Sequence, residues 1–320
     1  LARVIHLSYL SLARIAYKLG DEIPASYDAA LFYYRKVPKE STNYSEALFE
    51  SAWAYFLKGN VRRGMGIFHS LDGPDWEHHY FPDTHLLEAQ VFLNYCYTKK
   101  AKGAIARLKR EYLDLKPALK LYMETYDQGV YTAFIHKKLK NGVDLPRRLY
   151  LSVISDGRFF DSYSRVSKYS REVIDIERNK DLFGAAATPT VARLLFGSEL
   201  TERLLERARE LENEGVMILT QNILAILLDR QAELEKLEEQ KIELEISIES
   251  QEADVLEQEI SQAKQEDLIT EAAEINAESQ RTSNLLVGEK YLTWCFEGEF
   301  WRDEIDNYRS YLKSQCKEGN

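Results

Sequence analysis

Small and aromatic residues recur in a fixed pattern in the first third of this 320-residue chain. Ala52, Tyr55 and Gly59 follow one another at intervals of three and four residues, and Gly64 and Phe68 continue the pattern. Two helices approach closely where a small side chain on one faces an aromatic ring on the other, and a glycine after the first helix supplies a left-handed cap. The pattern therefore predicts a pair of antiparallel helices.

The pattern recurs on both sides of this pair. Ala16 precedes Tyr55 by 39 residues, and Tyr95 follows Tyr55 by 40 residues. In the third copy, Lys99 stands where the glycine is expected. A single helical pair cannot bury its apolar face, so copies in register favour stacked pairs over an irregular helical bundle. We therefore expect an all-α protein that begins with an α-solenoid.

The sequence YSEALFESAWAYFLKGN (residues 44–60) resembles the tetratricopeptide repeats (TPR) of bacterial envelope proteins, in the style of the lipoprotein component of the outer-membrane β-barrel assembly machinery. The resemblance covers roughly residues 5–120, with insertions near residues 21–27 and 72–83, and we assign the TPR-like repeats to residues 1–120. It implies a TPR-like α-solenoid that binds other proteins, in a periplasmic or outer-membrane-associated location.

In a repeat solenoid, the first helix of each pair lines the concave surface. The alignment to the repeat therefore predicts an apolar and aromatic groove for a partner's peptide or helix. Its expected residues are Tyr17, Phe49, Trp53, Phe56, Leu93 and Tyr97. The alternative is that these side chains are buried against neighbouring helices of the same chain.

Proline and glycine divide the remainder of the chain. All seven prolines lie at or before Pro189, and no glycine occurs between Gly215 and Gly288. We expect residues 121–188 to form additional helical repeats or a capping bundle. Residues 189–287 are expected to form a long acidic helix, starting near Thr190, or a helical hairpin that turns near residues 247–254.

The expected long helix carries an incomplete coiled-coil pattern. Its partial heptad comprises Leu227, Leu234, Leu237, Leu244, Ile248 and Val255. Arg230, Lys241 and Gln251 fall on the same seam, which is then too polar for a stable dimeric coiled coil. A long projecting helix or a hairpin therefore fits the pattern better.

Acidic residues concentrate in the same region. Residues 231–281 contain sixteen acidic and four basic residues, whereas the whole chain has a formal charge of −10. No basic footprint for nucleic acid is present, so we expect no nucleic-acid partner. The acidic residues are interpreted as a solvated helix face, with a dock for a basic partner as the alternative.

Aromatic residues crowd the last segment, and residues 288–320 are predicted to form an aromatic-rich C-terminal helical hairpin that turns at residues 297–299. The candidate partner-binding patch comprises Trp294, Phe296, Phe300, Trp301, Arg302 and Tyr308, because Trp, Tyr and Arg dominate interface hot spots. The alternative is an aromatic core that clamps the C-terminus back onto the helical body.

No residue pattern in the chain predicts catalysis or metal binding. His78, His79 and His85 lie near acidic residues between repeats, but their spacing matches no metal motif, so we expect a surface loop and no cofactor. The three cysteines form no CxxC pair. Phosphate-loop, dinucleotide and metalloprotease motifs are absent from the sequence. We therefore expect a protein that is not an enzyme.

The expected helices indicate which cysteines can form a disulfide. Cys96 is expected within the first helix of the third pair, as a small buried thiol. Cys295 and Cys316 would lie too far apart in the expected hairpin to bond each other. A bond from either of them to Cys96 stays open.

The leading hypothesis is an interaction scaffold within a multi-subunit envelope assembly, such as motility, secretion or outer-membrane machinery. The alternative is a cytoplasmic TPR adaptor or co-chaperone that binds a peptide in its groove. No uninterrupted apolar run is long enough for a membrane span. Residues 1–12 resemble the inside of a helix rather than a signal peptide, so we expect a longer parent chain whose N-terminal part could carry a lipid anchor.

Overall fold

The computed structural model describes residues 2–76, 79–126, 129–185, 198–266, 301–310, 312 and 314–316. Its regular elements are helices, and no strand occurs among these residues. This confirms the predicted all-α class.

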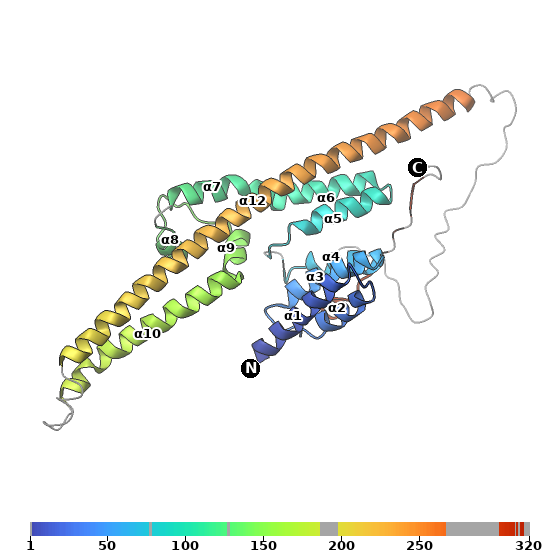
Figure 1. The fold of residues 1–320 in the computed structure, drawn as a ribbon. Coiled ribbons are helices and arrows are strands. Elements are labelled where there is room, and N and C mark those ends of the chain that lie inside the picture. The colour runs from blue at the N-terminus through green and yellow to red at the C-terminus, as the bar shows by residue number, and fades with distance from the viewer. Residues whose placement is uncertain are drawn as a thin grey trace. The chain divides into compact units, whose positions relative to one another are not determined.

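Three pairs of short helices come first in the chain (Figure 1). They are α1 (Ala2–Leu19) and α2 (Ser26–Tyr34), α3 (Tyr44–Leu57) and α4 (Val61–Leu71), and α5 (Asp83–Asn94) and α6 (Thr98–Glu111). The elements that follow are η1 (Leu113–Leu115), α7 (Lys116–Thr125), α8 (Val130–His136), α9 (Arg147–Ile154), α10 (Gly157–Ala185), α12 (Ser198–Glu266) and η2 (Arg302–Glu304).

The chain divides into two compact units, each built from separate stretches of sequence. The N-terminal unit comprises residues 1–77, 84–105 and 241–320, and the central unit comprises residues 78–83 and 106–240. This division differs from the consecutive segments expected from the sequence, which were 1–120, 121–188, 189–287 and 288–320. The difference arises because α12 contributes residues to both units.

In the N-terminal unit, α1 packs on α2, α2 on α3, and α3 on α4. Small residues make this close packing possible. Ala13 and Ala52 are fully buried. A Cβ added to Gly64 would lie 2.6 Å from the ring of Phe56. The predicted pairing of small and aromatic residues is therefore present in these helices.

The third helical pair differs from its predicted register. Helix α5 ends at Asn94, and Cys96 lies in the turn to α6 with a φ of 60°. Gly59 has the same left-handed conformation, with a φ of 78°, in the turn between α3 and α4. Cys96 therefore takes the glycine position. The predictions that Lys99 would occupy it, and that Cys96 would lie within the helix, are wrong.

The corrected register places small residues at matching positions. Ala89 in α5 corresponds to Ala52 in α3, and both are fully buried. Ala89 and Ala101 belong to a core cluster that α12 completes with Leu244 and Ile248. The second half of α12 is thus part of the core of the third pair.

In the central unit, α10 and α12 run antiparallel. An ion pair of 2.8 Å between Arg158 and Asp229 and one of 2.5 Å between Glu177 and Arg209 link the two helices. Val173 of α10 and Leu205 of α12 belong to one buried cluster between them. The connection between the helices, including the predicted helix start near Thr190, lies outside the described residues.

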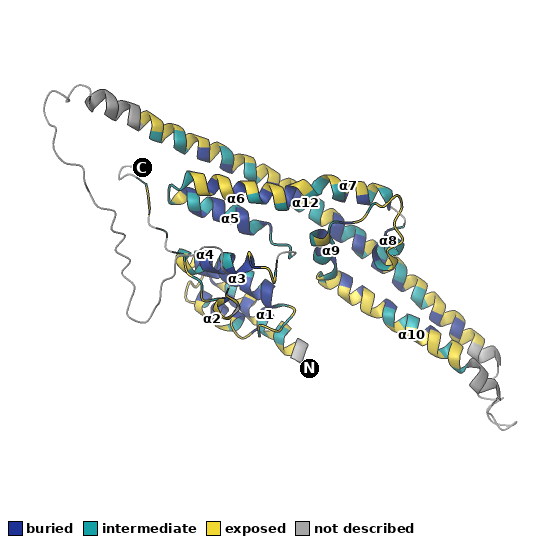
Figure 2. Cartoon of the chain, turned by 180° about the vertical axis from the view of Figure 1, so that it is seen from behind, coloured by how far each residue is buried: buried dark blue, intermediate teal, exposed yellow. Residues whose placement is uncertain are grey.

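Helix α12 continues without interruption through residues 247–254. The predicted turn there is wrong, and the alternative of one long helix is correct. Its buried positions form a stripe along the helix (Figure 2). Five of the predicted heptad residues are buried, namely Leu227, Leu234, Leu237, Leu244 and Ile248. Most acidic residues of this stretch that the structure describes are exposed.

Polar residues of the α12 seam find partners within the same chain. The Arg230 guanidinium lies 5.0 Å from the ring centre of Tyr80 in the central unit. The Gln251 side-chain amide donates to the carbonyl oxygen of Leu93 at 3.3 Å in the N-terminal unit. These contacts explain why a seam too polar for a dimeric coiled coil is nevertheless packed.

One stretch of α12 within residues 202–257 is long and apolar enough, by length and composition, to cross a membrane. This stretch includes the helix face that buries Leu219, Ile223 and Ile226 in the central unit. A helix packed inside a protein passes the same test. The expectation that the chain contains no membrane span stays a prediction.

Candidate functional site

The part of the C-terminal segment that the structure describes lies along the paired helices of the N-terminal unit in a largely extended form. We call its described residues, 301–310, 312 and 314–316, the strap. Apart from the short 3-10 turn η2, they contain no helix. The predicted second helix of a C-terminal hairpin is therefore wrong for these residues, because their backbone hydrogen bonds go to α4 and to the end of α5 rather than within a helix.

Main-chain hydrogen bonds hold the strap along the paired helices. The N–H of Ser310 donates to the carbonyl oxygen of Arg62 in α4 at 3.0 Å. The N–H of Gln315 donates to the carbonyl oxygen of Tyr95, just after α5, at 3.1 Å. The last carbonyls of a helix have no partner within the helix, so the strap satisfies one of these groups.

Gly66 of α4 allows the strap backbone to come this close. A Cβ atom added there would overlap the carbonyl oxygen of Tyr308 and lie 2.8 Å from the nitrogen of Arg309. The ring of Tyr308 packs edge-on against His69, with 4.7 Å between the ring centres. Any side chain at position 66 would therefore push the strap away from α4.

Ile305 and Asp306 anchor the first half of the strap. Ile305 is buried, with 6% of its surface exposed. The N–H of Asp306 faces the Ser70 hydroxyl oxygen at 3.4 Å. Burial raises the pKa of the Asp306 carboxyl, although the nearby positive charges of Arg63, Arg35 and Lys39 oppose the rise. The surface that receives Asp306 is thus basic but poorly solvated.

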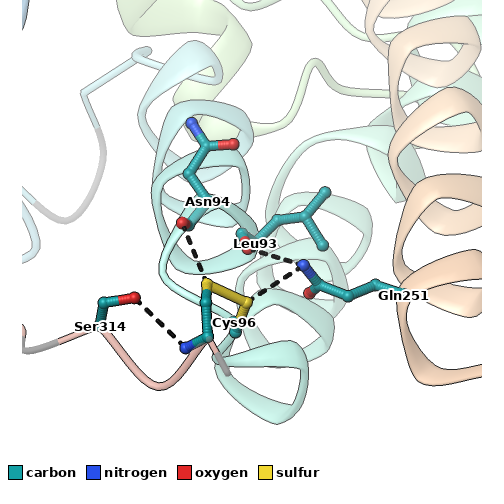
Figure 3. The surroundings of a disulfide bond; sticks show 6 residues. Leu93, Asn94, Cys96, Gln251 and Ser314 are labelled. Carbon is teal, nitrogen blue, oxygen red and sulfur yellow. Dashed lines mark hydrogen bonds between the residues drawn. A yellow bond between two sulfur atoms is a disulfide. The ribbon is translucent and has the colours of Figure 1, made fainter. Parts of the chain in front are cut away.

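A disulfide between Cys96 and Cys316 fixes the other end of the strap (Figure 3). Their Cα atoms are 5.1 Å apart, and the bond spans 220 positions of the sequence. The side-chain amide of Gln251 donates to the sulfur of Cys96 at 3.4 Å. Cys96 is therefore not the free thiol that its sequence neighbours indicated. Of the two pairings with Cys96 that the sequence left open, the one with Cys316 is formed.

Burial also lowers the pKa of the His69 imidazole, against a smaller opposing effect of Glu88. His85 is buried within α5, 3.4 Å from Glu88, so the predicted surface loop is wrong for this residue. Among the described residues, no three His, Cys, Asp or Glu side chains are grouped closely enough to hold a metal ion; the predicted loop residue His78 lies outside them.

The predicted groove residues lie mostly in packing contacts. Phe49 and Phe56 of α3 both contact the ring of Phe68 in α4. Tyr17 packs against Tyr27 of α2. Leu93 is buried in the core of the third pair. Leu93 is buried, whereas Tyr17, Phe49 and Phe56 are half-buried in contacts with neighbouring helices of the same chain.

The other two groove residues, Trp53 and Tyr97, are half-buried. Lys100 lies over the ring of Tyr97, with 4.9 Å from its amino group to the ring centre. On the first helices, Arg14 of α1 bonds both Glu46 and Glu50 of α3, at 2.5 Å and 2.6 Å. This face is therefore crossed by an ion-pair network.

The predicted aromatic patch is divided. Trp301 is 55% exposed, whereas Tyr308 packs on α4 and its hydroxyl accepts from the Trp301 N–H at 2.6 Å. Trp294, Phe296, Phe300 and the Arg302 side chain lie outside what the structure describes. The alternative of a C-terminus clamped back onto the helical body agrees with the position of Tyr308.

Sequence reasoning missed Gly66, Ser70 and Ile305. Gly66 comes two residues after Gly64, in a helix where one glycine already fits the repeat pattern. A second glycine in a helix interior is unfavourable by about 1 kcal/mol relative to alanine, which was an available signal of close backbone contact. Comparison with protein-family models, curated proteins and solved structures finds no match to this chain.

Proposed function

We propose that the chain is a non-enzymatic scaffold for protein–protein interaction, built on a TPR-like α-solenoid. The observation that supports this most directly is the strap. Paired helices of the N-terminal unit hold a peptide segment through main-chain hydrogen bonds to Arg62 and Tyr95 and through a buried Ile305. In strand addition to a sheet edge, main-chain bonds give affinity and side-chain pockets give specificity, and the strap combines the same two kinds of contact on paired helices.

We further propose that the protein is a structural subunit of a bacterial envelope assembly, such as motility, secretion or outer-membrane machinery. The disulfide between Cys96 and Cys316 favours an oxidising compartment. A periplasmic or outer-membrane-associated location meets that requirement. The alternative, a cytoplasmic adaptor, would expose the same cysteines to a reducing thiol pool.

Fractionation of the native source, with thiols alkylated at lysis, tests both parts of this proposal. We expect the protein in the envelope fraction, in a complex larger than its own 37.2 kDa. Cys96 and Cys316 should resist a maleimide reagent until a dithiol is added. Recovery from the cytosol with both thiols already reactive would contradict the compartment, and recovery as a lone monomer would contradict the scaffold.

A further inference from the structure

We propose that the strap occupies an exchangeable peptide-binding site, and that opening the Cys96–Cys316 bond lets this site bind the strap of a second copy of the chain. This inference deepens the proposed scaffold function and rests on it. It names the ligand, an extended segment carrying Ile305, Asp306 and Tyr308. It also names the reaction that regulates the exchange, which is reduction or formation of the disulfide.

The site is specific for a backbone as well as for side chains. Gly66 admits the main chain at Tyr308, and Arg62 and Tyr95 accept its N–H groups. The buried Ile305 and the Tyr308 ring on His69 fix the register. A segment with a branched apolar residue followed three positions later by an aromatic residue meets these requirements. The chain carries such a segment in its own C-terminus.

The disulfide is the covalent part of this attachment. A dithiol reductant attacks one sulfur, the sulfur–sulfur bond breaks, and two electrons and two protons convert Cys96 and Cys316 to thiols while the reductant becomes a disulfide. The strap is then held by the non-covalent contacts alone. Its tether still gives it a high effective concentration at its own site. Exchange therefore requires crowded copies, as within an assembly.

A second copy is the occupant that the chemistry favours. Every chain carries one strap and one site that already fit each other, so exchange creates no new kind of contact. Exchange of an identical element between protomers is a low-cost route to association. An exchanged strap could then be locked by a bond from Cys316 of one copy to Cys96 of the other.

Two full-length variants that cannot form the bond internally test this proposal. The strap donor carries Cys96→Ser, and the site donor carries Cys316→Ser with Ile305→Asp to weaken its own strap. Both also carry Cys295→Ser, so each chain retains one cysteine. The two chains are mixed at high protein concentration in a glutathione buffer, where oxidised glutathione accepts the two electrons and two protons released when Cys316 and Cys96 bond. We expect a covalent heterodimer, confirmed by peptide mapping without reduction.

Glycine substitutions in the site donor supply the matched comparison. Gly66→Ala should reduce the heterodimer by roughly tenfold or more, equivalent to at least about 1.4 kcal/mol. Gly103→Ala, in α6, should leave the yield unchanged because an added Cβ there meets nothing within 4 Å. Circular dichroism checks that both remain folded.

The outcomes separate the two proposals. Heterodimer that forms equally well with Gly66→Ala would overturn the site, and absence of heterodimer between folded chains would overturn the exchange. Gly66→Ala placed in the strap donor should maintain or increase the yield, because it loosens that chain's own strap, and a loss there would also contradict the assignment. None of these results depends on the compartment or on other subunits, which only the fractionation experiment tests.

Discussion

The turn between α3 and α4 and the turn between α5 and α6 have the same backbone geometry but different chemistry. Gly59 adopts a φ of 78° in the first turn, and Cys96 adopts a φ of 60° in the second. A glycine takes this conformation at no steric cost, whereas another residue there costs of order 1 kcal/mol or more. The second turn has Cys96 at this unfavourable position, and a disulfide joins Cys96 to Cys316 of the strap.

This difference shows how a repeat position can be diverted from folding to attachment. The left-handed residue after a helix lies outside the regular helical bonding and caps the helix through its N–H, which Gly59 donates to Phe56 at 2.8 Å and Cys96 donates to Leu93 at 2.9 Å. It is therefore a position from which a side chain can reach another segment. At Gly59 the position only ends a helix, while at Cys96 it also fixes the C-terminus.

The largest expected effect comes from removing the covalent attachment at the second turn. Cys316→Ser leaves Cys96 in place and should lower the unfolding free energy by about 2–5 kcal/mol, measured by guanidinium denaturation without reductant. Under a dithiol, the variant and the original chain should denature alike. A persistent difference in reductant would mean that Cys316 contributes by packing.

Overpacking the two helical pairs tests whether they are equivalent. Ala52→Leu and Ala89→Leu each add bulk at a fully buried position and should each destabilise the protein by about 1–3 kcal/mol. Thermal unfolding of both variants measures this. The register predicted from the sequence matched Phe92, instead of Ala89, to Ala52. If Ala89→Leu left the stability unchanged, that predicted register would be supported instead.

Glycine and alanine can be compared at both turns. Gly59→Ala should cost about 1 kcal/mol because of the positive φ. At the second turn, Cys96→Gly should be more stable than Cys96→Ala by a similar amount, and since both lack the disulfide, their difference isolates the backbone. The denaturant midpoints of the two variants measure this stability difference, provided that the unfolding free energy falls with denaturant at the same slope in both. Equal stability of the Cys96 pair would indicate that this turn relaxes when the strap is free.

The smallest expected effect concerns the Asp306 carboxylate, which the strap buries against the paired helices. Burial raises the pKa of Asp306, so its stabilising contribution is fully present below the ordinary pKa and is lost as pH rises through the raised value. Asp306→Asn should therefore slightly increase the free energy of unfolding at neutral pH. It should also make that free energy less dependent on pH in the acidic range. Denaturation across the acidic range measures this; a loss of stability at neutral pH would show that Arg35, Lys39 and Arg63 outweigh burial.

Local patterns predicted much of the helical core. The spacing of Ala52 and Gly64 predicted the α3–α4 pair, because the steric fit of small residues to aromatic rings is encoded within one stretch of sequence. The heptad residues Leu234 and Ile248 likewise identified the buried stripe of α12. That helix pairs with α10 instead of folding back on itself, which depends on contacts between distant segments.

The strap could not be predicted from comparable patterns. An extended segment held by main-chain bonds has no periodicity, and its aromatic residues suggested a helix. The turn between α5 and α6 could not be predicted at Cys96, because cysteine is not expected at a positive φ. Its partner lies 220 positions away, and no local rule connects residues so far apart.

The same bond turns most of the molecule into a covalent ring. The backbone from Cys96 to Cys316, which includes α7 to α12, is closed on itself by two sulfur atoms. A protease that cuts the backbone once inside this ring does not release a fragment, because the disulfide still joins the two pieces. The cut protein would migrate as one species on an unreduced gel and separate into two only after reduction, so cleavage alone would not dismantle it.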